Sequence, residues 1–373
     1  MTYLGENIKK LGFGLMRLPM IGQEVDLEQT KQMVDLFLDR GFTYFDTAYG
    51  YIDGKSEEAV KTALVDRHPR ESFQLATKLP AWHGAATAEE AQNMFRTSLK
   101  RTGAGYFDFY LLHNLGVGRT EAFDRFGIWD FLAKQKEAGL IKHLGFSLHA
   151  TADILDEVLT RHPEMEFVQL QINYSDWDNG IIQSRKCYEV ARKHNKPIII
   201  MEPVKGGALA NLPAEVAAIL KEANLQASPA SWAMRYAASL DGLITVLSGM
   251  STLDQMKDNI SYMENFQPLS PEERTVLEKA RQALAKIPQI PCTDCRYCLK
   301  DCPQQIAIPG TFRIMNDYLI YRNLETAKMH YGWETMWLHK ASDCIECGQC
   351  ETVCPQSIPI IKELAGAVKV LEG

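Results

Sequence analysis

Eight of the nine cysteines in this 373-residue chain belong to one pattern, C-x2-C-x2-C-x3-C-P, which occurs twice near the C-terminus. The runs are Cys292, Cys295, Cys298 and Cys302 before Pro303, and Cys344, Cys347, Cys350 and Cys354 before Pro355. Each run packs four thiols into eleven residues, and no apolar leader or cleavage site follows Met1. This crowding favours thiolate ligands to metal in a reducing compartment over a framework of disulfides.

The spacing resembles the iron–sulfur run of bacterial two-cluster ferredoxins, in which the fourth cysteine of each run ligates the other cluster. The resemblance implies two 4Fe-4S clusters, one on Cys292, Cys295, Cys298 and Cys354 and the other on Cys344, Cys347, Cys350 and Cys302. Zinc is the alternative, since C-x2-C pairs also build tetrahedral zinc sites, although those pairs usually stand further apart. The ninth cysteine, Cys187, lies in an apolar-periodic stretch and is expected in the core.

The bulk composition is typical of a globular protein with a large domain ahead of the cysteines. A hydrophobic content of 46% and a charged content of 23% are ordinary for a chain that buries a sizeable core. The net charge of -7 and the lack of a basic run argue against nucleic acid as a partner. No apolar stretch is long enough to span a bilayer, so we expect a cytoplasmic protein.

From Leu11 to about Asn265, short β-rich runs alternate with longer segments of helical periodicity, which predicts a parallel sheet. The expected strands are Leu11–Leu15, Thr43–Asp46, Phe73–Thr77, Phe107–Leu112, His143–Phe146, Phe167–Gln171, Pro197–Met201 and Leu243–Leu247. The expected helices include Leu27–Arg40, Ser56–Asp66, Ala88–Arg101, Thr151–Arg161 and Ile181–His194, with Asp26 and Ser56 as N-caps and Gly41 as a C′ residue. Eight such units over roughly 250 residues match a closed (β/α)8 barrel. An open doubly wound sheet is the alternative, but the segment 12–14 lacks the third glycine of a dinucleotide fingerprint.

Prolines mark the start of a second domain. A helical segment at Pro271–Ile287 is followed by two prolines immediately before the first cysteine run. The spacer between the runs holds two more helical segments, Phe312–Tyr321 and Leu324–Leu338, and resembles the α-helical ferredoxin module of respiratory iron–sulfur subunits. We therefore expect an α/β chain with a (β/α)8 TIM barrel over 1–285 and a small, mainly helical, two-cluster ferredoxin-like domain over 286–373.

Ionisable residues stand where three successive strands are expected to end. Asp46 closes the second strand, Lys78 follows the third and His113 follows the fourth. Tyr51 comes five positions after Asp46, in the loop beyond that strand. Active-site residues of such barrels sit at the carboxyl ends of the strands, so we expect these four side chains to meet at one mouth. Each one alone has an ordinary structural role as its alternative.

These four residues resemble the catalytic tetrad of the aldo-keto reductases. The segment GFTYFDTA at 41–48 is similar to the family's second-strand signature, and GKSEE at 54–58 to the start of its next helix. The resemblance covers about Leu11 to Asn259 and points to the branch with a C-terminal 4Fe-4S ferredoxin domain. It implies hydride transfer from a nicotinamide to a carbonyl carbon, with Tyr51 as proton donor, Lys78 lowering the tyrosine pKa, Asp46 holding Lys78, and His113 positioning the substrate oxygen.

The same resemblance implies the nicotinamide contacts. Ser147 and Gln171, at the ends of the fifth and sixth strands, would bond the carboxamide. The eighth-strand loop would grip the adenosine end through Gly249, Met250, Ser251, Gln255 and Asn259. NADPH-specific members carry a lysine and an arginine where this chain has Gly249 and Gln255, so the cofactor is NADPH or NADH. Tyr49, Trp82 and His83 are expected to line the substrate mouth.

Three functions fit these features. The first is reduction of a small aldehyde or ketone in the barrel, with the clusters passing single electrons to a redox partner protein or to the substrate. The second is carbonyl reduction with clusters that are purely structural. The third is an electron-transfer adaptor without reductase turnover, which the intact tetrad argues against. Coupling hydride pairs to one-electron clusters calls for a group such as flavin, for which the sequence shows no motif, although a barrel mouth can bind a phosphate-bearing cofactor without one.

Overall fold

The computed structural model describes residues 4–292, 294–300, 302–354 and 356–373. Its contacts divide the chain into two compact units, which are treated separately below. The first unit comprises Met1–Val204 and Ala230–Ser270, and the second comprises Lys205–Pro229 and Pro271–Gly373. The domain boundary that the sequence places between 285 and 286 remains a prediction.

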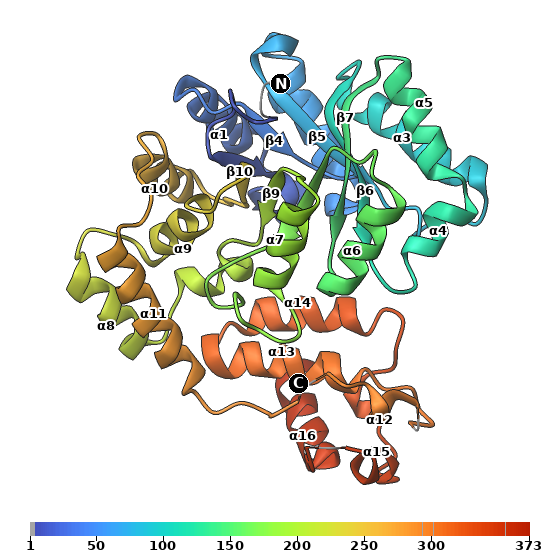
Figure 1. The fold of residues 1–373 in the computed structure, drawn as a ribbon, viewed down its shortest axis with the longest axis vertical. Coiled ribbons are helices and arrows are strands. Elements are labelled where there is room, and N and C mark those ends of the chain that lie inside the picture. Colours follow the sequence, from blue (N-terminus) through green and yellow to red (C-terminus); the bar gives the residue numbers. More distant parts are fainter. Residues whose placement is uncertain (1–3, 293, 301, 355) are drawn as a thin grey trace. The chain divides into compact units, whose positions relative to one another are not determined.

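The first unit contains a closed barrel of parallel strands, ordered β1-β10-β9-β8-β7-β6-β5-β4 (Figure 1). The barrel strands are β1 (Leu11–Gly14), β4 (Tyr44–Asp46), β5 (Gln74–Leu79), β6 (Phe107–Leu115), β7 (Ile141–Leu148), β8 (Phe167–Gln171), β9 (Ile198–Met201) and β10 (Leu243–Ser248). Each overlaps an expected strand, and β1 closes the barrel by pairing with both β10 and β4. The predicted (β/α)8 class is therefore confirmed, and the open-sheet alternative is wrong.

Helices of the first unit surround these strands in Figure 1. They are α1 (Leu27–Asp39), α2 (Lys55–Val60), α3 (Ala88–Thr102), α4 (Thr120–Arg125), α5 (Ile128–Glu137), α6 (Ala152–Arg161), α7 (Ser184–Lys193), α9 (Pro229–Ala238) and α10 (Leu253–Met263). Asp26 caps α1 as predicted, accepting a hydrogen bond from the Gln29 amide (3.0 Å), and Gly41 follows the helix with φ +73°. Ser56 is not an N-cap, because α2 begins one residue earlier and the Ser56 hydroxyl donates instead to the Leu15 carbonyl (2.9 Å).

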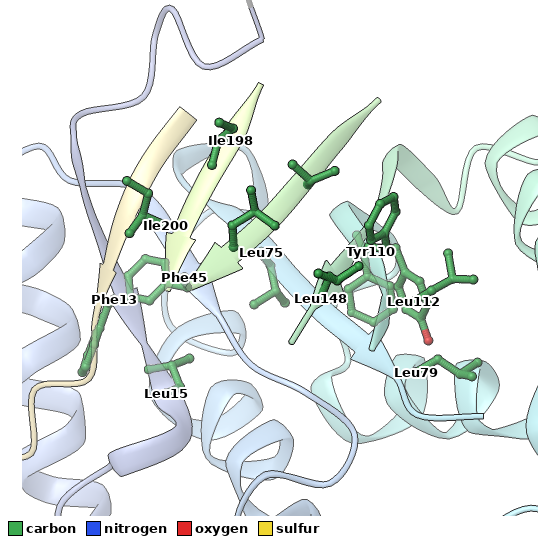
Figure 2. Packing of buried hydrophobic residues seen from close by; sticks show 14 of the residues in the cluster. Phe13, Leu15, Phe45, Leu75, Leu79, Tyr110, Leu112, Leu148, Ile198 and Ile200 are labelled. Atoms are coloured by element: carbon green, nitrogen blue, oxygen red, sulfur yellow. The ribbon is translucent and has the colours of Figure 1, made fainter. Parts of the chain in front are cut away.

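The alternation of side chains along the strands separates two apolar clusters. Phe45, Leu75 and Ile200 point outward and pack in the cluster between strands and helices shown in Figure 2. The intervening residues point into the barrel and form a smaller inner cluster, which includes Tyr44, Ala76, Phe109, Leu111, Phe167, Ile199 and Ile244. Cys187 of α7 belongs to the outer cluster, and burial raises the pKa of its thiol to about 11, as expected for a core residue. The period-2 pattern thus determines which residues can reach the barrel interior.

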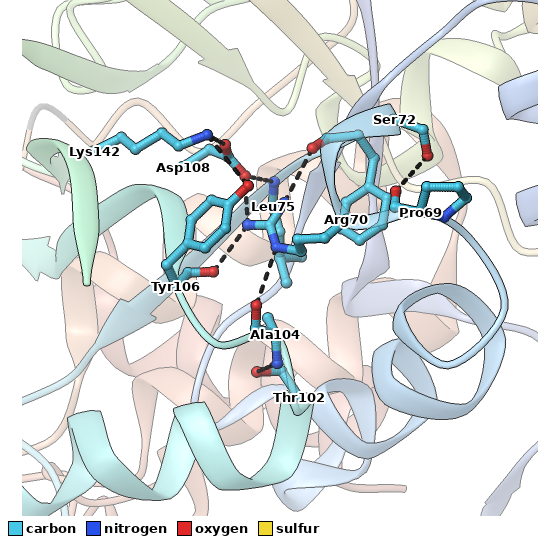
Figure 3. Close-up of polar contacts among 10 residues, drawn as sticks. Pro69, Arg70, Ser72, Leu75, Thr102, Ala104, Tyr106, Asp108 and Lys142 are labelled. Carbon is cyan, nitrogen blue, oxygen red and sulfur yellow. Dashed lines mark hydrogen bonds and ion pairs between the residues drawn. The ribbon is translucent and has the colours of Figure 1, made fainter. Parts of the chain in front are cut away.

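An ionic network around the buried Asp108 carboxylate joins the amino-terminal ends of three strands (Figure 3). Asp108, the second residue of β6, accepts from Arg70 (2.6 Å), from Lys142 of β7 (2.8 Å) and from the Leu75 amide of β5 (3.0 Å). Arg70 also donates to the carbonyls of Ala104 (3.1 Å) and Tyr106 (2.8 Å). Charge on a nearly buried carboxylate is tolerated because cations and an amide surround it.

The second unit is mainly helical within the residues described. It contains α8 (Ala214–Ala223), α11 (Pro271–Ala285), α12 (Tyr297–Lys300), α13 (Ile308–Tyr321), α14 (Leu324–Glu334), α15 (Gln349–Thr352) and α16 (Ile360–Ala367). Helices α8 and α11 pack on each other, while α13 packs on both α14 and α16. A separate apolar cluster around Phe312, Ile314, Tyr331 and Leu364 forms the core of the cysteine-bearing part. No helix of the described chain is both long and apolar enough to cross a membrane.

Candidate active site and cysteine cavities

The four predicted active-site residues lie together at the carboxyl ends of β4, β5 and β6. Asp46, Lys78 and His113 each stand two positions after an inward-facing residue of the inner cluster, namely Tyr44, Ala76 and Leu111. Side chains two apart on a strand share a face, so these groups form the next layer of the barrel interior. The core is thus apolar below and ionisable above, toward the mouth.

Lys78 is the centre of this layer. Its Nζ donates to Asp46 Oδ1 (2.5 Å) and to the Thr47 carbonyl (2.7 Å), and it lies 3.4 Å from the Tyr51 hydroxyl. The side chains of Lys78 and Asp46 are 0% and 3% exposed. Burial alone would lower the pKa of Lys78, but Asp46 and Tyr51 together raise it above its usual value. Lys78 therefore stays charged, and its positive charge lies beside the tyrosine hydroxyl.

Tyr51 reaches Lys78 from a tight turn, η2 (Tyr51–Gly54). Ile52 and Asp53 adopt left-handed backbone with φ of 51° and 53°, and Gly54 follows with φ +89°. The left-handed backbone favours glycine at this position, and a Cβ there would also displace the guanidinium of Arg101, whose Cζ would lie 2.7 Å away. This strained turn aims Tyr51 back over the end of β4.

The pKa of Tyr51 differs from the sequence-based expectation. Burial raises it above the usual value, and the opposing effect of Lys78 is too small to reverse this. The charges of Asp46 and Glu202 raise it further. Desolvation is a property of the folded site, which is why the charge of Lys78 alone predicted the wrong direction. At neutral pH Tyr51 is a phenol that holds its proton.

His113 completes the layer as a neutral imidazole. Burial, followed by the charge of Lys78, places its pKa well below the usual range. The ring lies edge-on to Tyr51 with centroids 5.8 Å apart, and Trp82 Nε1 donates to the His113 carbonyl (2.7 Å). Within the described residues, His113 Nδ1 and Asp46 Oδ2 are buried without a hydrogen-bond partner. Unsatisfied buried atoms at a strand-end mouth fit a site that awaits a polar ligand.

The two residues predicted to bond the nicotinamide carboxamide each contact another protein group. The Ser147 hydroxyl accepts a hydrogen bond from the backbone N–H of Asn114 (2.8 Å), and Gln171 Oε1 lies 3.2 Å from Nδ1 of His149. Both stand at inward-facing positions near the carboxyl ends of β7 and β8. They lie on the same end of the barrel as the tetrad, as the strand-end rule requires.

The predicted adenosine residues lie in the loop after β10 (Gly249, Met250 and Ser251) and in the helix α10 that follows it (Gln255 and Asn259). Gln255 accepts from the Ser251 amide (2.7 Å), and the stem of Arg17 lies beside Gly249. The Met250 side chain is in the outer core, so only its backbone is available to a ligand. Asn259 donates to Ser248 Oγ (2.6 Å) and accepts from the Tyr262 hydroxyl, so protein groups engage both ends of its amide.

Glu202 is an ionisable residue at a strand end that the sequence analysis did not consider. It directly follows β9, has a left-handed backbone with φ 54°, and receives a hydrogen bond on its carbonyl from Asn173 Nδ2 (3.3 Å). Its charge contributes to the raised pKa of Tyr51. The rule that located Asp46, Lys78 and His113 would have found Glu202 if it had been applied to the seventh barrel strand.

Two cavities in the second unit are lined by the cysteines of the paired runs. The lining of one cavity includes Cys292, Cys295, Cys298 and Cys354. The lining of the other includes Cys302, Cys344, Cys347 and Cys350. Each combines three cysteines of one run with the fourth of the other, which is the partition that the spacing predicts. Among the described residues, no three Cys, His, Asp or Glu side chains converge tightly enough to hold a single metal ion.

The two cavities repeat the same backbone at an offset of 52 positions, as between Cys292 and Cys344. Left-handed φ angles occur in matched pairs at Asp294 and Glu346 (52° and 55°), and at Arg296 and Gly348 (64° and 75°). A third pair is Gln305 and Ser357 (48° and 50°). Helices α12 and α15, and the starts of α13 and α16, are related in the same way. The two cradles are therefore built alike. Pro355, which closes the second run, lies outside the described residues.

Comparisons with known proteins agree with both parts of the chain. The profile of the aldo/keto reductase family matches residues 10–282, and that of a 4Fe-4S dicluster domain matches 291–358. Aldo-keto reductase family 1 member C21 of Rattus norvegicus is 24% identical over 319 residues, or 76% of this chain and 91% of that protein. Uncharacterized oxidoreductase YqkF of Bacillus subtilis (strain 168) is 22% identical over 306 residues, or 73% and 92%.

Solved structures share the barrel. Aldo-keto reductase AKR11C1 from Bacillus halodurans, in its holo form, superposes with a TM-score of 0.60 at 24% identity, covering 74% of this chain and 95% of that one. An aldo-keto reductase from Klebsiella pneumoniae in complex with NADPH gives 0.56 at 21% identity, covering 74% and 93%. Because the family profile matches most of its length, the chain belongs to the aldo/keto reductase family of NAD(P)-dependent oxidoreductases and carries a 4Fe-4S dicluster domain after its barrel.

Proposed function

We propose that the barrel reduces a small aldehyde or ketone with NADPH or NADH, and that the tetrad carries this reaction. The observation that supports it is the buried Lys78, which contacts both Asp46 and the Tyr51 hydroxyl. A nicotinamide, when bound, supplies the hydride that adds to the carbonyl carbon. The chain's residues then have to orient the carbonyl and give its oxygen a proton.

Tyr51 is the proton donor in this proposal. Its raised pKa keeps the phenol protonated at neutral pH, so the acid form is ready when charge develops on the carbonyl oxygen. As the O–H bond breaks and the proton moves to that oxygen, the phenolate left behind is stabilised by Lys78, and Asp46 holds Lys78 in place. Neutral His113 can donate a hydrogen bond to the same oxygen without carrying a charge. Solvent then reprotonates Tyr51.

Replacing the hydroxyl of Tyr51 tests the assignment. Tyr51→Phe should remove NAD(P)H-dependent carbonyl reduction, with kcat reduced by about 10²–10⁴-fold, while the cluster absorbance is unchanged. Tyr106→Phe is the matched control, because it removes a phenol at the amino-terminal end of β6 and should leave kcat as it is. Full turnover by the Tyr51 variant would refute the tetrad assignment.

The choice of nicotinamide is open to NADH. The neutral pair Gly249 and Gln255 offers no charge-assisted bond to a 2′-phosphate, and Gln255 is occupied by the Ser251 amide. Gln255→Arg should shift the ratio of kcat/KM values toward NADPH by about tenfold, since a hydrogen bond to a charged group contributes about 1.5–3 kcal/mol. Gln255→Leu, which breaks the same loop bond without adding charge, should not shift that ratio.

We further propose that the cysteine cavities hold two 4Fe-4S clusters with the ligand sets that line them. The matched cavities and the shared backbone repeat support this partition. When bound, each cluster stores one electron. Protein that is produced in a reducing cytoplasm and purified without oxygen should contain about eight iron atoms and eight labile sulfides per chain. A content of about four, or zinc in their place, would contradict the proposal.

The clusters, in this proposal, exchange electrons with a redox partner protein. Cys298→Ser tests the link to the barrel: if carbonyl reduction with NAD(P)H survives in a folded protein that has lost a cluster, the clusters lie outside that catalytic path. Anaerobic spectra after NADH and then NADPH would reveal bleaching of the clusters by the nicotinamide. Bleaching only when flavin is added would identify the group that splits hydride pairs into single electrons.

A further inference from the structure

The two cysteine cradles are alike in backbone and in the burial of their ligands. Cys295 and Cys347 are exposed, Cys298 and Cys350 are buried, and the remaining four are intermediate. Because solvent exposure of a cluster affects its reduction potential, this match removes one cause of difference between the two sites. Any difference must then come from the residues that the repeat does not preserve.

Charge is what the repeat does not preserve. Arg296 lines the first cavity, and its counterpart Gly348 lines the second. Among the described residues that line either cavity, Arg296 is the only one with a charged side chain. Its guanidinium pairs with Asp294 at 3.2 Å, so the acid next to the first cavity is compensated.

The acids of the second run have no such compensation. Glu346, the counterpart of Asp294, has no ion-pair partner among the described residues. Glu351 stands where the first run has Leu299, and within the described part of the chain its Oε1 accepts only a backbone hydrogen bond, from Ile361 (2.9 Å). Across the whole runs, Lys300 and Asp301 cancel, so the first run is neutral and the second has a net charge of -2.

We propose that Arg296 sets the order in which the two clusters accept electrons, with the cluster on Cys292, Cys295, Cys298 and Cys354 reduced first. The inference rests on the two-cluster proposal above. Each reduction adds one electron from a low-potential one-electron donor and makes the cluster more negative by one charge. A nearby cation favours that reduced form, whereas uncompensated carboxylates disfavour it. The cluster in the first cavity therefore has the higher reduction potential, and the cluster in the second cavity is reduced only after it.

The repeat itself supplies the test variant. Arg296→Gly copies the residue that the chain already uses at the same left-handed position, so the backbone accepts it without strain. Dithionite titration of the holoprotein, followed by visible absorbance and electron paramagnetic resonance, should give two midpoints in the parent protein. In Arg296→Gly the higher midpoint should fall toward the lower one, which stays in place. Arg296→Lys, which keeps the charge, should retain most of the separation.

The reciprocal variant moves the other cluster. A Cβ on Gly348 meets open space, and although its φ of +75° strains any side chain, Arg296 already occupies the matched left-handed position with φ 64°. Gly348→Arg should therefore raise the lower midpoint while leaving the higher one unchanged. Two clusters with midpoints that neither variant shifts would overturn the proposed order and leave the two-cluster proposal standing. An iron content of about four atoms per chain would overturn both.

Discussion

The barrel buries ionic groups at both of its ends, and the two ends treat them differently. At the amino-terminal end, Asp108 accepts from two cations and a backbone amide, so both of its oxygens are engaged. At the carboxyl-terminal end, Asp46 bonds Lys78 through one oxygen, and its second oxygen has no partner within the described chain. His113 Nδ1, in the same layer, is likewise unsatisfied there.

This difference separates a site built for stability from one built for a ligand. Leaving a buried polar atom unpaired costs about 1–3 kcal/mol, and a polar ligand bound at the mouth would recover that cost. The network around Asp108 has nothing left to bind. The layer of Asp46, Lys78, Tyr51 and His113 retains capacity for new hydrogen bonds, which suits the end that we propose receives substrate and nicotinamide.

Breaking the ion pair between Lys78 and Asp46 should have the largest effect on turnover and on stability. Lys78→Met should reduce kcat for carbonyl reduction by about 10²–10⁴-fold, because the Tyr51 phenolate loses its cation. It should also lower stability by about 3–5 kcal/mol, since Asp46 is left buried and unpaired. Steady-state kinetics and urea unfolding followed by circular dichroism measure the two effects. The double variant Lys78→Met with Asp46→Asn should recover stability without recovering turnover; recovery of both would contradict the comparison.

Breaking the amino-terminal network should affect stability alone. Asp108→Asn leaves Arg70 with an uncompensated charge in a mostly buried position and should lower the free energy of unfolding by about 3 kcal/mol. The kcat of the folded fraction should be unchanged, because Asp108 lies at the opposite end of β6 from His113. A loss of kcat comparable to that of the Lys78 variant would show that the two ends are not independent.

The pH dependence of turnover sharpens the same contrast. Tyr51 acts as an acid and its pKa is raised, so the rate of carbonyl reduction should stay flat through neutral pH and fall only above the usual tyrosine value of 10.0. His113, whose pKa lies well below 6.5, stays neutral as the pH falls through that value, so no step should appear there. Initial rates at saturating nicotinamide from pH 6 to 11 would reveal either step. A fall in rate near pH 7 would refute the acid role of Tyr51.

The smallest expected effect concerns Ser56 of α2, which contacts the residues that directly follow β1 and β4. The buried Ser56 hydroxyl donates to the Leu15 carbonyl (2.9 Å) and lies 2.7 Å from Thr47 Oγ1. Ser56→Ala should lower the free energy of unfolding by about 1–2 kcal/mol and change kcat little. A kcat loss near that of Lys78→Met would mean that Ser56 positions Lys78 through Thr47, whose carbonyl accepts from Lys78.

Much of the barrel follows from local pattern. Each expected strand is present in the structure. Successive residues of a strand point to opposite faces, and here both faces are buried, as Phe45 in the outer cluster and Tyr44 in the inner cluster show. The same parity placed Asp46, Lys78 and His113 in one layer. Asp26 capped its helix as expected because an N-cap depends only on neighbours in sequence.

Two predictions were wrong because they depend on tertiary structure. Serine is a common N-cap residue, yet the Ser56 hydroxyl donates to the carbonyl of Leu15, which is distant in sequence. The pKa of Tyr51 depends on how much solvent the fold removes, which charge counting along the chain does not include. Glu202 was missed although its signal was present, because ionisable residues were sought only at consecutive strand ends.

The exchange of fourth cysteines between the two cradles has a consequence for biogenesis. If the cavities hold clusters as proposed, the cradle encoded first is the last to become complete, since it needs Cys354, the final cysteine of the second run. The other needs Cys302 from the first run and closes only when Cys350 is made. Neither run can complete a cluster alone, so cluster insertion requires that both runs have been made and have folded against each other.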